Sequence, residues 1–158
     1  MKLHAVCFSL LFAATLAFAE LKIEHTEPHR MEGFEFTRMA NLMGDKEATD
    51  PTRVAVATNP KEKSGIYFEA ELNQTVASLP AGSVAVVEVL VDADRAPRTF
   101  KLPVPATKNN SKVLYLGLTD APFVHATKKS PHLLAWKISI LDKDGKTLAE
   151  APSALWQY

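Results

Sequence analysis

The chain has almost no cysteine. Cys7 is the only one in 158 residues, and it lies in an apolar stretch at the N-terminus. A domain that begins after this stretch has no disulfide, no thiol nucleophile and no cysteine metal ligand. Secreted eukaryotic domains more often carry disulfides. The absence therefore favours a bacterial envelope protein.

Glycine is also scarce, and its distribution excludes several catalytic signatures. The six glycines are dispersed, and none forms the GxGxxG or GxxxxGK loops that cradle phosphate groups. The sequence has no HExxH zinc motif and no GxSxG nucleophile elbow. We therefore expect a protein that is not an enzyme and that uses no cofactor.

Neither sign of charge is in excess. The chain has 18 Lys and Arg residues against 18 Asp and Glu residues. Binding to nucleic acid or to an anionic membrane surface requires a basic excess or a basic stripe. The sequence therefore predicts no nucleic-acid partner.

The N-terminus has the pattern of an export signal. An uncharged apolar run over residues 5–18 leads to a small-x-small motif that ends at Ala19, with Glu20 as the first mature residue. No later stretch approaches the ~20 apolar residues of a membrane helix. We predict a signal peptide over residues 1–19 and one domain over residues 20–158. The protein would be exported, periplasmic or secreted, without stable membrane insertion.

The clearest structural pattern precedes an Asp-Gly turn near the C-terminus. The apolar residues there alternate with small or polar ones: Leu134, Trp136, Ile138 and Ile140. This period of two is typical of a strand with one buried face. Residues Asp142 to Gly145 then predict a turn with the glycine in the left-handed conformation, followed by a returning strand to Glu150.

Other segments show the same alternation or β-branched composition, and no helical period of useful length appears. They are residues 21–24, 33–38, 53–58, 66–72, 83–91, 100–104 and 113–118. Apolar residues on both faces place 83–91 in the centre of a sheet, whereas Pro103 marks 100–104 as an edge. Pro28 is expected to end or interrupt the first strand.

These patterns predict an all-β protein. We expect a single β-sandwich of about 8–9 short, mostly antiparallel strands, with an immunoglobulin-like or cupredoxin-like layout. A small closed barrel is the alternative. The leading functional hypothesis is a non-enzymatic binding module whose partner is an unknown protein or an envelope polymer. Sequence alone does not identify that partner.

A second hypothesis is a periplasmic copper carrier. His25, His29 and Met31 lie close together in the sequence, and imidazole with thioether is a donor set that suits copper. The Trp136 strand and its Asp-Gly turn are loosely similar to the end of periplasmic copper-resistance proteins of the cupredoxin-like type. The histidine that follows the Asp-Gly in that family is Lys146 here.

A third hypothesis is a carbohydrate-binding module. Tyr67, Trp136 and Trp156 could form an aromatic platform for stacking on sugar rings. The alternation around Trp136 instead predicts a core position for that residue. Leu155 and Trp156 are expected to pack back on the body of the domain.

Overall fold

The computed structural model describes residues 20–32, 54–94, 96–108, 110–124 and 131–157. The strands are β1 (Ile23–Met31), β2 (Val54–Ala57), β3 (Gly65–Leu72), β4 (Val84–Val91), β5 (Arg98–Pro103), β6 (Val113–Leu118), β7 (Leu133–Leu141) and β8 (Thr147–Pro152). Two short 3-10 helices are η1 (Val76–Ser78) and η2 (Ala154–Gln157). The predicted strand at 33–38 and the predicted signal peptide lie outside the described residues.

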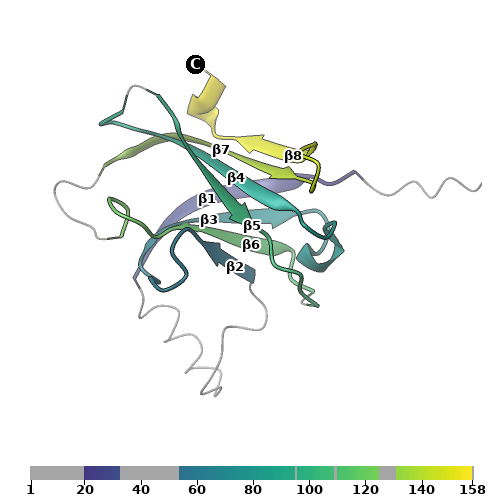
Figure 1. Ribbon diagram of the computed structural model, residues 1–158. Coiled ribbons are helices and arrows are strands. Elements are labelled where there is room, and N and C mark those ends of the chain that lie inside the picture. Colours follow the sequence, from purple (N-terminus) through teal and green to yellow (C-terminus); the bar gives the residue numbers. More distant parts are fainter. Residues whose placement is uncertain (1–19, 33–53, 95, 109, 125–130, 158) are drawn as a thin grey trace, which may run out of the picture.

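The strands form two four-stranded sheets (Figure 1). Sheet A has the order β1-β3-β6-β2, and sheet B has the order β5-β4-β7-β8. Neighbouring strands are antiparallel, except that β2 runs parallel to β6. Two open sheets that face each other confirm the predicted β-sandwich, in place of the closed barrel that was its alternative.

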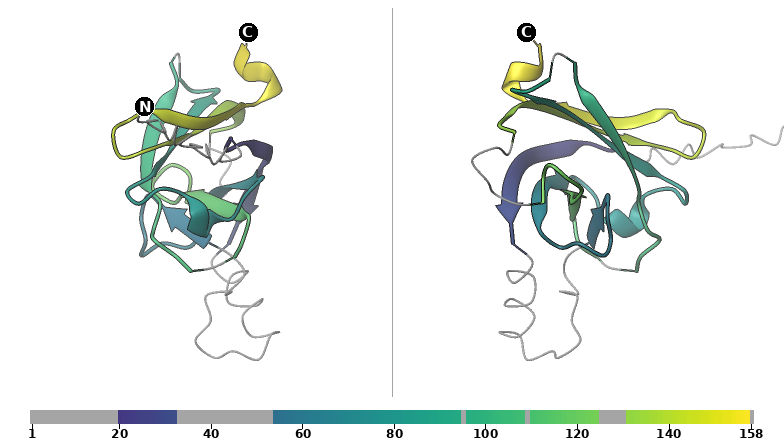
Figure 2. Two further views of the ribbon diagram at one scale, coloured as in Figure 1. Left: turned by 90° about the vertical axis from the view of Figure 1, so that its right-hand side faces the viewer. Right: turned by 60° about the vertical axis from the view of Figure 1, so that its left-hand side comes forward.

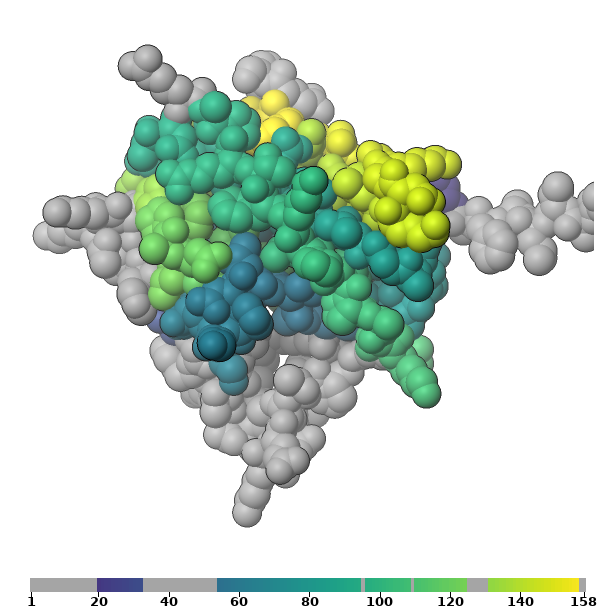
Figure 3. Space-filling model, viewed as in Figure 1, coloured from purple at the N-terminus to yellow at the C-terminus, as the bar shows by residue number. Residues whose placement is uncertain are grey.

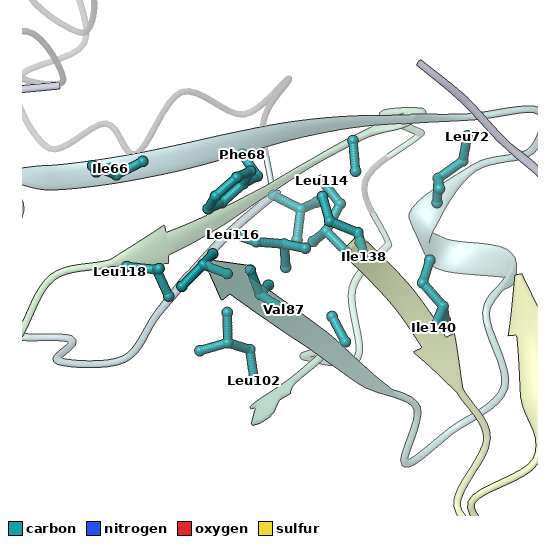
Figure 4. Close-up of a cluster of buried hydrophobic side chains, with 14 of the residues drawn as sticks. Ile66, Phe68, Leu72, Val87, Leu102, Leu114, Leu116, Leu118, Ile138 and Ile140 are labelled. Carbon is teal, nitrogen blue, oxygen red and sulfur yellow. The ribbon is translucent and has the colours of Figure 1, made fainter. Parts of the chain in front are cut away.

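The inner faces of the two sheets enclose one apolar core (Figure 4). Its largest fully buried side chains are Phe68, Phe123, Leu72, Leu102, Leu114, Leu116, Leu118, Ile138 and Ile140. Burying a side chain of this kind stabilises the fold by about 1.5–3 kcal/mol. The core is therefore the main reason that the two sheets stay together.

Figure 2 shows the two layers from the side, with β1 curving from the edge of sheet A towards sheet B. The indole Nε1–H of Trp136 in sheet B donates to Thr26 Oγ1 in β1 at 3.3 Å. In the space-filling view, β1 appears only at the margin, and the front surface comes mostly from β5, the β7–β8 hairpin and the chain after β2 (Figure 3).

Several predicted strand positions are confirmed. β4 lies between β5 and β7 in the centre of sheet B, the central position that its apolar residues predicted. β5, which ends at Pro103, is an edge strand. In the turn before β8, Gly145 has φ +83°, and Asp142 Oδ1 accepts the backbone N–H groups of Asp144 and Lys146 at 2.9 Å each.

The prediction for Pro28 is wrong. β1 runs through this proline from Ile23 to Met31, and Pro28 lies opposite Phe68 in the pairing with β3. A proline removes one ladder hydrogen bond, which an edge strand tolerates because one of its sides has no neighbouring strand. The edge position of β1 therefore explains why the strand continues.

The predictions for Leu134 and Leu155 are also wrong. Leu134 is 44% exposed, and Leu133 packs against the core in its place. The cause is a register shift between β4 and β7, in which Leu90 pairs with Ala135 and Val91 pairs with Leu133. A bulge of this kind reverses the faces of the residues beyond it. Leu155, in η2, is 64% exposed and does not pack back.

Candidate functional site on the outer face of β1 and β3

The pairing of β1 with β3 brings polar side chains together on one surface. Phe68 and Ala70 of β3 point into the core, so Glu69 and its alternating neighbours point outward. Glu27 of β1 lies directly opposite Glu69. By the same alternation, the set that we call the β1–β3 outer face consists of His25, Glu27, His29, Tyr67, Glu69 and Glu71.

Two histidines approach the carboxylates of this face. His29 Nε2 lies 3.7 Å from Glu27 Oε2 and 3.7 Å from Glu69 Oε2. His25 Nε2 lies 3.7 Å from Glu27 Oε2, on the other side of that carboxylate. Glu27 is 59% exposed, so water screens these contacts and each one alone adds little to stability.

A buried tyrosine fixes one of the carboxylates. The hydroxyl of Tyr115 in β6 donates a hydrogen bond to Glu69 Oε2 at 2.9 Å. Tyr115 is buried and lies directly opposite Glu69 in the pairing of β3 with β6. The Glu69 oxygen that is near His29 therefore has its position set by a residue of the next strand.

Tyr67 forms the apolar side of this face. Its ring lies over Gly117 of β6, where an added Cβ would be 2.5 Å from Cε1 of the ring. Its hydroxyl donates to the backbone oxygen of Lys63 at 3.0 Å. Burial, and secondly the carboxylate of Glu62, raise the pKa of Tyr67 to about 12.

This raised pKa predicts a loss of stability at alkaline pH. The folded state favours the protonated phenol relative to the unfolded chain, whose tyrosines ionise near pH ~10. The contribution of Tyr67 is therefore complete below that value and declines as the pH rises towards about 12. In a titration followed by phenolate absorbance, Tyr67 should ionise late, and Tyr67→Phe should remove the late phase. An unchanged late phase in the variant would contradict the assignment.

The structure places the three predicted metal ligands on one strand. His25, His29 and Met31 all belong to β1 at alternating positions, and Met31 lies opposite Gly65 of β3. In the part of the chain that is described, no group of three or more His, Cys, Asp or Glu side chains could hold a metal ion. Met39 and Met43, further along the sequence, lie outside the described residues.

The three aromatic residues of the carbohydrate hypothesis lie on different surfaces. Trp136 is between the sheets, with its ring centroid 6.0 Å from that of Phe68, and it packs against the core as predicted. Trp156 lies outside sheet B, where Lys137 Nζ is 5.5 Å from its ring centroid. Tyr67 belongs to the β1–β3 outer face. The three rings therefore do not form a common platform for stacking on a sugar.

Sequence reasoning missed Glu27, Glu69 and Tyr115 as site residues. Glu27 could have been found, because the alternation His25-x-Glu27-x-His29 puts all three on one face of a strand. The other two could not, because Glu69 and Tyr115 are 46 residues apart and meet only through the pairing of β3 with β6. No local sequence pattern predicts such a contact between distant strands.

No family model, curated protein or solved structure matches this chain. Within the described ranges, no helix is both long enough and apolar enough to cross a bilayer.

Proposed function

We propose that this protein is an exported, non-enzymatic binding module with an immunoglobulin-like layout. Export is supported by the apolar N-terminal run and the cleavage motif before Glu20. Binding is supported above all by the convergence of His29, Glu27 and Glu69 from two strands onto an open sheet face.

Strand order supports the immunoglobulin-like layout. In that fold, one sheet has the order A-B-E-D and the other contains C-F-G, with C′ added beside C in variable-type domains. Here β1, β3 and β6 take the places of A, B and E, and β5, β4, β7 and β8 take those of C′, C, F and G. β2 has the place of D but runs parallel to β6, which departs from the antiparallel pattern.

Charge on the β1–β3 outer face indicates the kind of ligand. Its carboxylates are Glu27, Glu69 and Glu71, and no Lys or Arg belongs to this set. Complementary charge steers a partner to such a surface and determines its orientation. We therefore expect a protein or an envelope polymer that presents positively charged groups.

The test is capture of partners from an envelope extract of the source cell, using the immobilised protein with EDTA present. Glu27→Lys should abolish the capture of any specifically bound component, because it reverses charge at the centre of the face. Glu150→Lys is the matched control, since Glu150 is similarly exposed at 48% but belongs to β8 in sheet B. Equal capture by both variants would contradict the proposed surface, provided that both unfold at the temperature of the unmodified protein.

Metal transport is the second candidate function, because His25, His29 and Met31 share one strand. A copper carrier that uses His25, His29 and Met31 stays a prediction. No contact in the described residues favours the carbohydrate hypothesis over these two.

A further inference from the structure

We propose that the peptide bond between Ala19 and Glu20 is hydrolysed before β1 docks on β3, because the folded domain withdraws the residues after this bond from a peptidase. Asn73, which follows β3, is the residue that fastens them. This inference rests on the export that the proposed function includes. It does not depend on the binding partner.

Asn73 binds the backbone on both sides of Leu21. An asparagine side chain carries both a donor and an acceptor. Here Nδ2 donates to the backbone oxygen of Glu20 at 2.8 Å, and Oδ1 accepts the backbone N–H of Lys22 at 2.9 Å. The backbone N–H of Asn73 also donates to the backbone oxygen of Lys22 at 3.1 Å. One asparagine therefore fixes the first three residues after the predicted cleavage motif.

Apolar packing holds the same segment. Leu21 and Ile23 pack against the core between the two sheets, and the pairing of β1 with β3 begins with Ile23 opposite Leu72. Lifting these side chains away from the core would expose apolar surface to water, which is unfavourable. The chain is thus fastened to the domain from Glu20 onward, and no spacer separates the domain from the bond to be cut.

Asn73 is itself held in place by the residue before it. Leu72 is completely buried in the core cluster (Figure 4). Its backbone N–H donates to the backbone oxygen of Lys112 at 2.8 Å. Because Leu72 cannot move without disturbing the core, Asn73 is a fixed point to which residues 20–22 are tied.

Hydrolysis of the bond requires a different conformation of this segment. Water adds across the peptide bond, which leaves a carboxylate on Ala19 and an ammonium group on Glu20. The peptidase must enclose the chain on both sides of the bond, and proteolysis is concentrated where the backbone is exposed and mobile. While Asn73 holds Glu20 and Lys22, cleavage must await a local opening of the segment. Cleavage before docking avoids this step and is therefore the faster order.

The experiment uses a purified bacterial signal peptidase and two substrates, the full chain folded in detergent micelles and a peptide of residues 1–30. Mass spectrometry measures the rate of hydrolysis after Ala19. The peptide should be cleaved at least about tenfold faster, because it lacks the domain that holds residues 20–22 and because proteolysis follows the population of the open form.

Substitutions of Asn73 test the role of this residue. Asn73→Ala should raise the cleavage rate of the folded full chain by about tenfold, since the loss of two hydrogen bonds raises the population of the opened segment. Asn73→Asp should raise the rate less, because a carboxylate still accepts the N–H of Lys22 but no longer donates to Glu20.

Asn59→Ala is the matched control. Asn59 is half-buried like Asn73, and its Oδ1 likewise accepts a backbone N–H, that of Lys61 at 3.1 Å. It lies before β3, whereas Asn73 follows that strand. Its replacement should leave the cleavage rate within about twofold of the unmodified chain.

Two results would overturn this inference and leave export standing. They are cleavage of the folded full chain as fast as that of the peptide, or equal rates for Asn73→Ala, Asn73→Asp and Asn59→Ala. If the peptide is not cleaved after Ala19, the proposed export is wrong, and this inference with it. Backbone circular dichroism shows whether each variant is folded, and Asn73→Asp decides if Asn73→Ala is not. Partner capture is measured separately, so none of these results affects the proposed binding surface.

Discussion

Phe68→Ala is expected to lower the free energy of unfolding by about 3–5 kcal/mol. Phe68 is completely buried between the two sheets, and its ring lies beside that of Trp136. Truncation removes apolar contacts and leaves a cavity that paired strands on both sides cannot collapse to fill. Urea unfolding followed by circular dichroism measures the change.

Two leucines of β7 provide an internal control for this prediction. Leu134→Ala should cost under about 1 kcal/mol, because Leu134 is already 44% exposed. Leu133→Ala should cost more, since Leu133 packs against the core. The reverse order of these two losses would show that the bulge between β4 and β7 is misplaced. A loss below about 1 kcal/mol for Phe68→Ala would mean that the core lies elsewhere.

The second large effect is expected for Gly65→Ala, which should destabilise the protein by about 3 kcal/mol. A Cβ at Gly65 would lie 2.3 Å from the backbone oxygen of Leu118. This oxygen belongs to β6, the strand next to β3, so it cannot rotate away as a side chain would. The two strands must separate locally, and the end of β1 opposite Gly65 would loosen with them.

Gly145→Ala is the control for the steric part of this effect. Gly145 has open space around its Cα, but its φ of +83° is unfavourable for residues with a Cβ. Its replacement should therefore cost only about 1 kcal/mol. If thermal unfolding shows equal losses for both variants, the close approach of β3 and β6 at Gly65 does not limit stability.

Much of the fold could be predicted because strand residues alternate with a period of two. Residues 66–72 show this alternation, whereas 83–91 is a β-branched run whose apolar residues on both faces predicted its central place. Pro28 and Leu134 were misjudged for a shared reason. Whether a strand tolerates a proline, and which face a leucine takes beyond a bulge, depends on the neighbouring strand and not on the local sequence.

The candidate site, too, follows partly from the sequence and partly from the tertiary structure alone. The sequence by itself determined that His25, Glu27 and His29 share one face of a strand, because alternate side chains of an extended chain point the same way. Only the tertiary structure decided that Glu69 lies opposite Glu27, that Tyr115 holds Glu69, and that His29 approaches both carboxylates. These contacts depend on the register of three strands that are distant in sequence, and register is set by how the whole core packs.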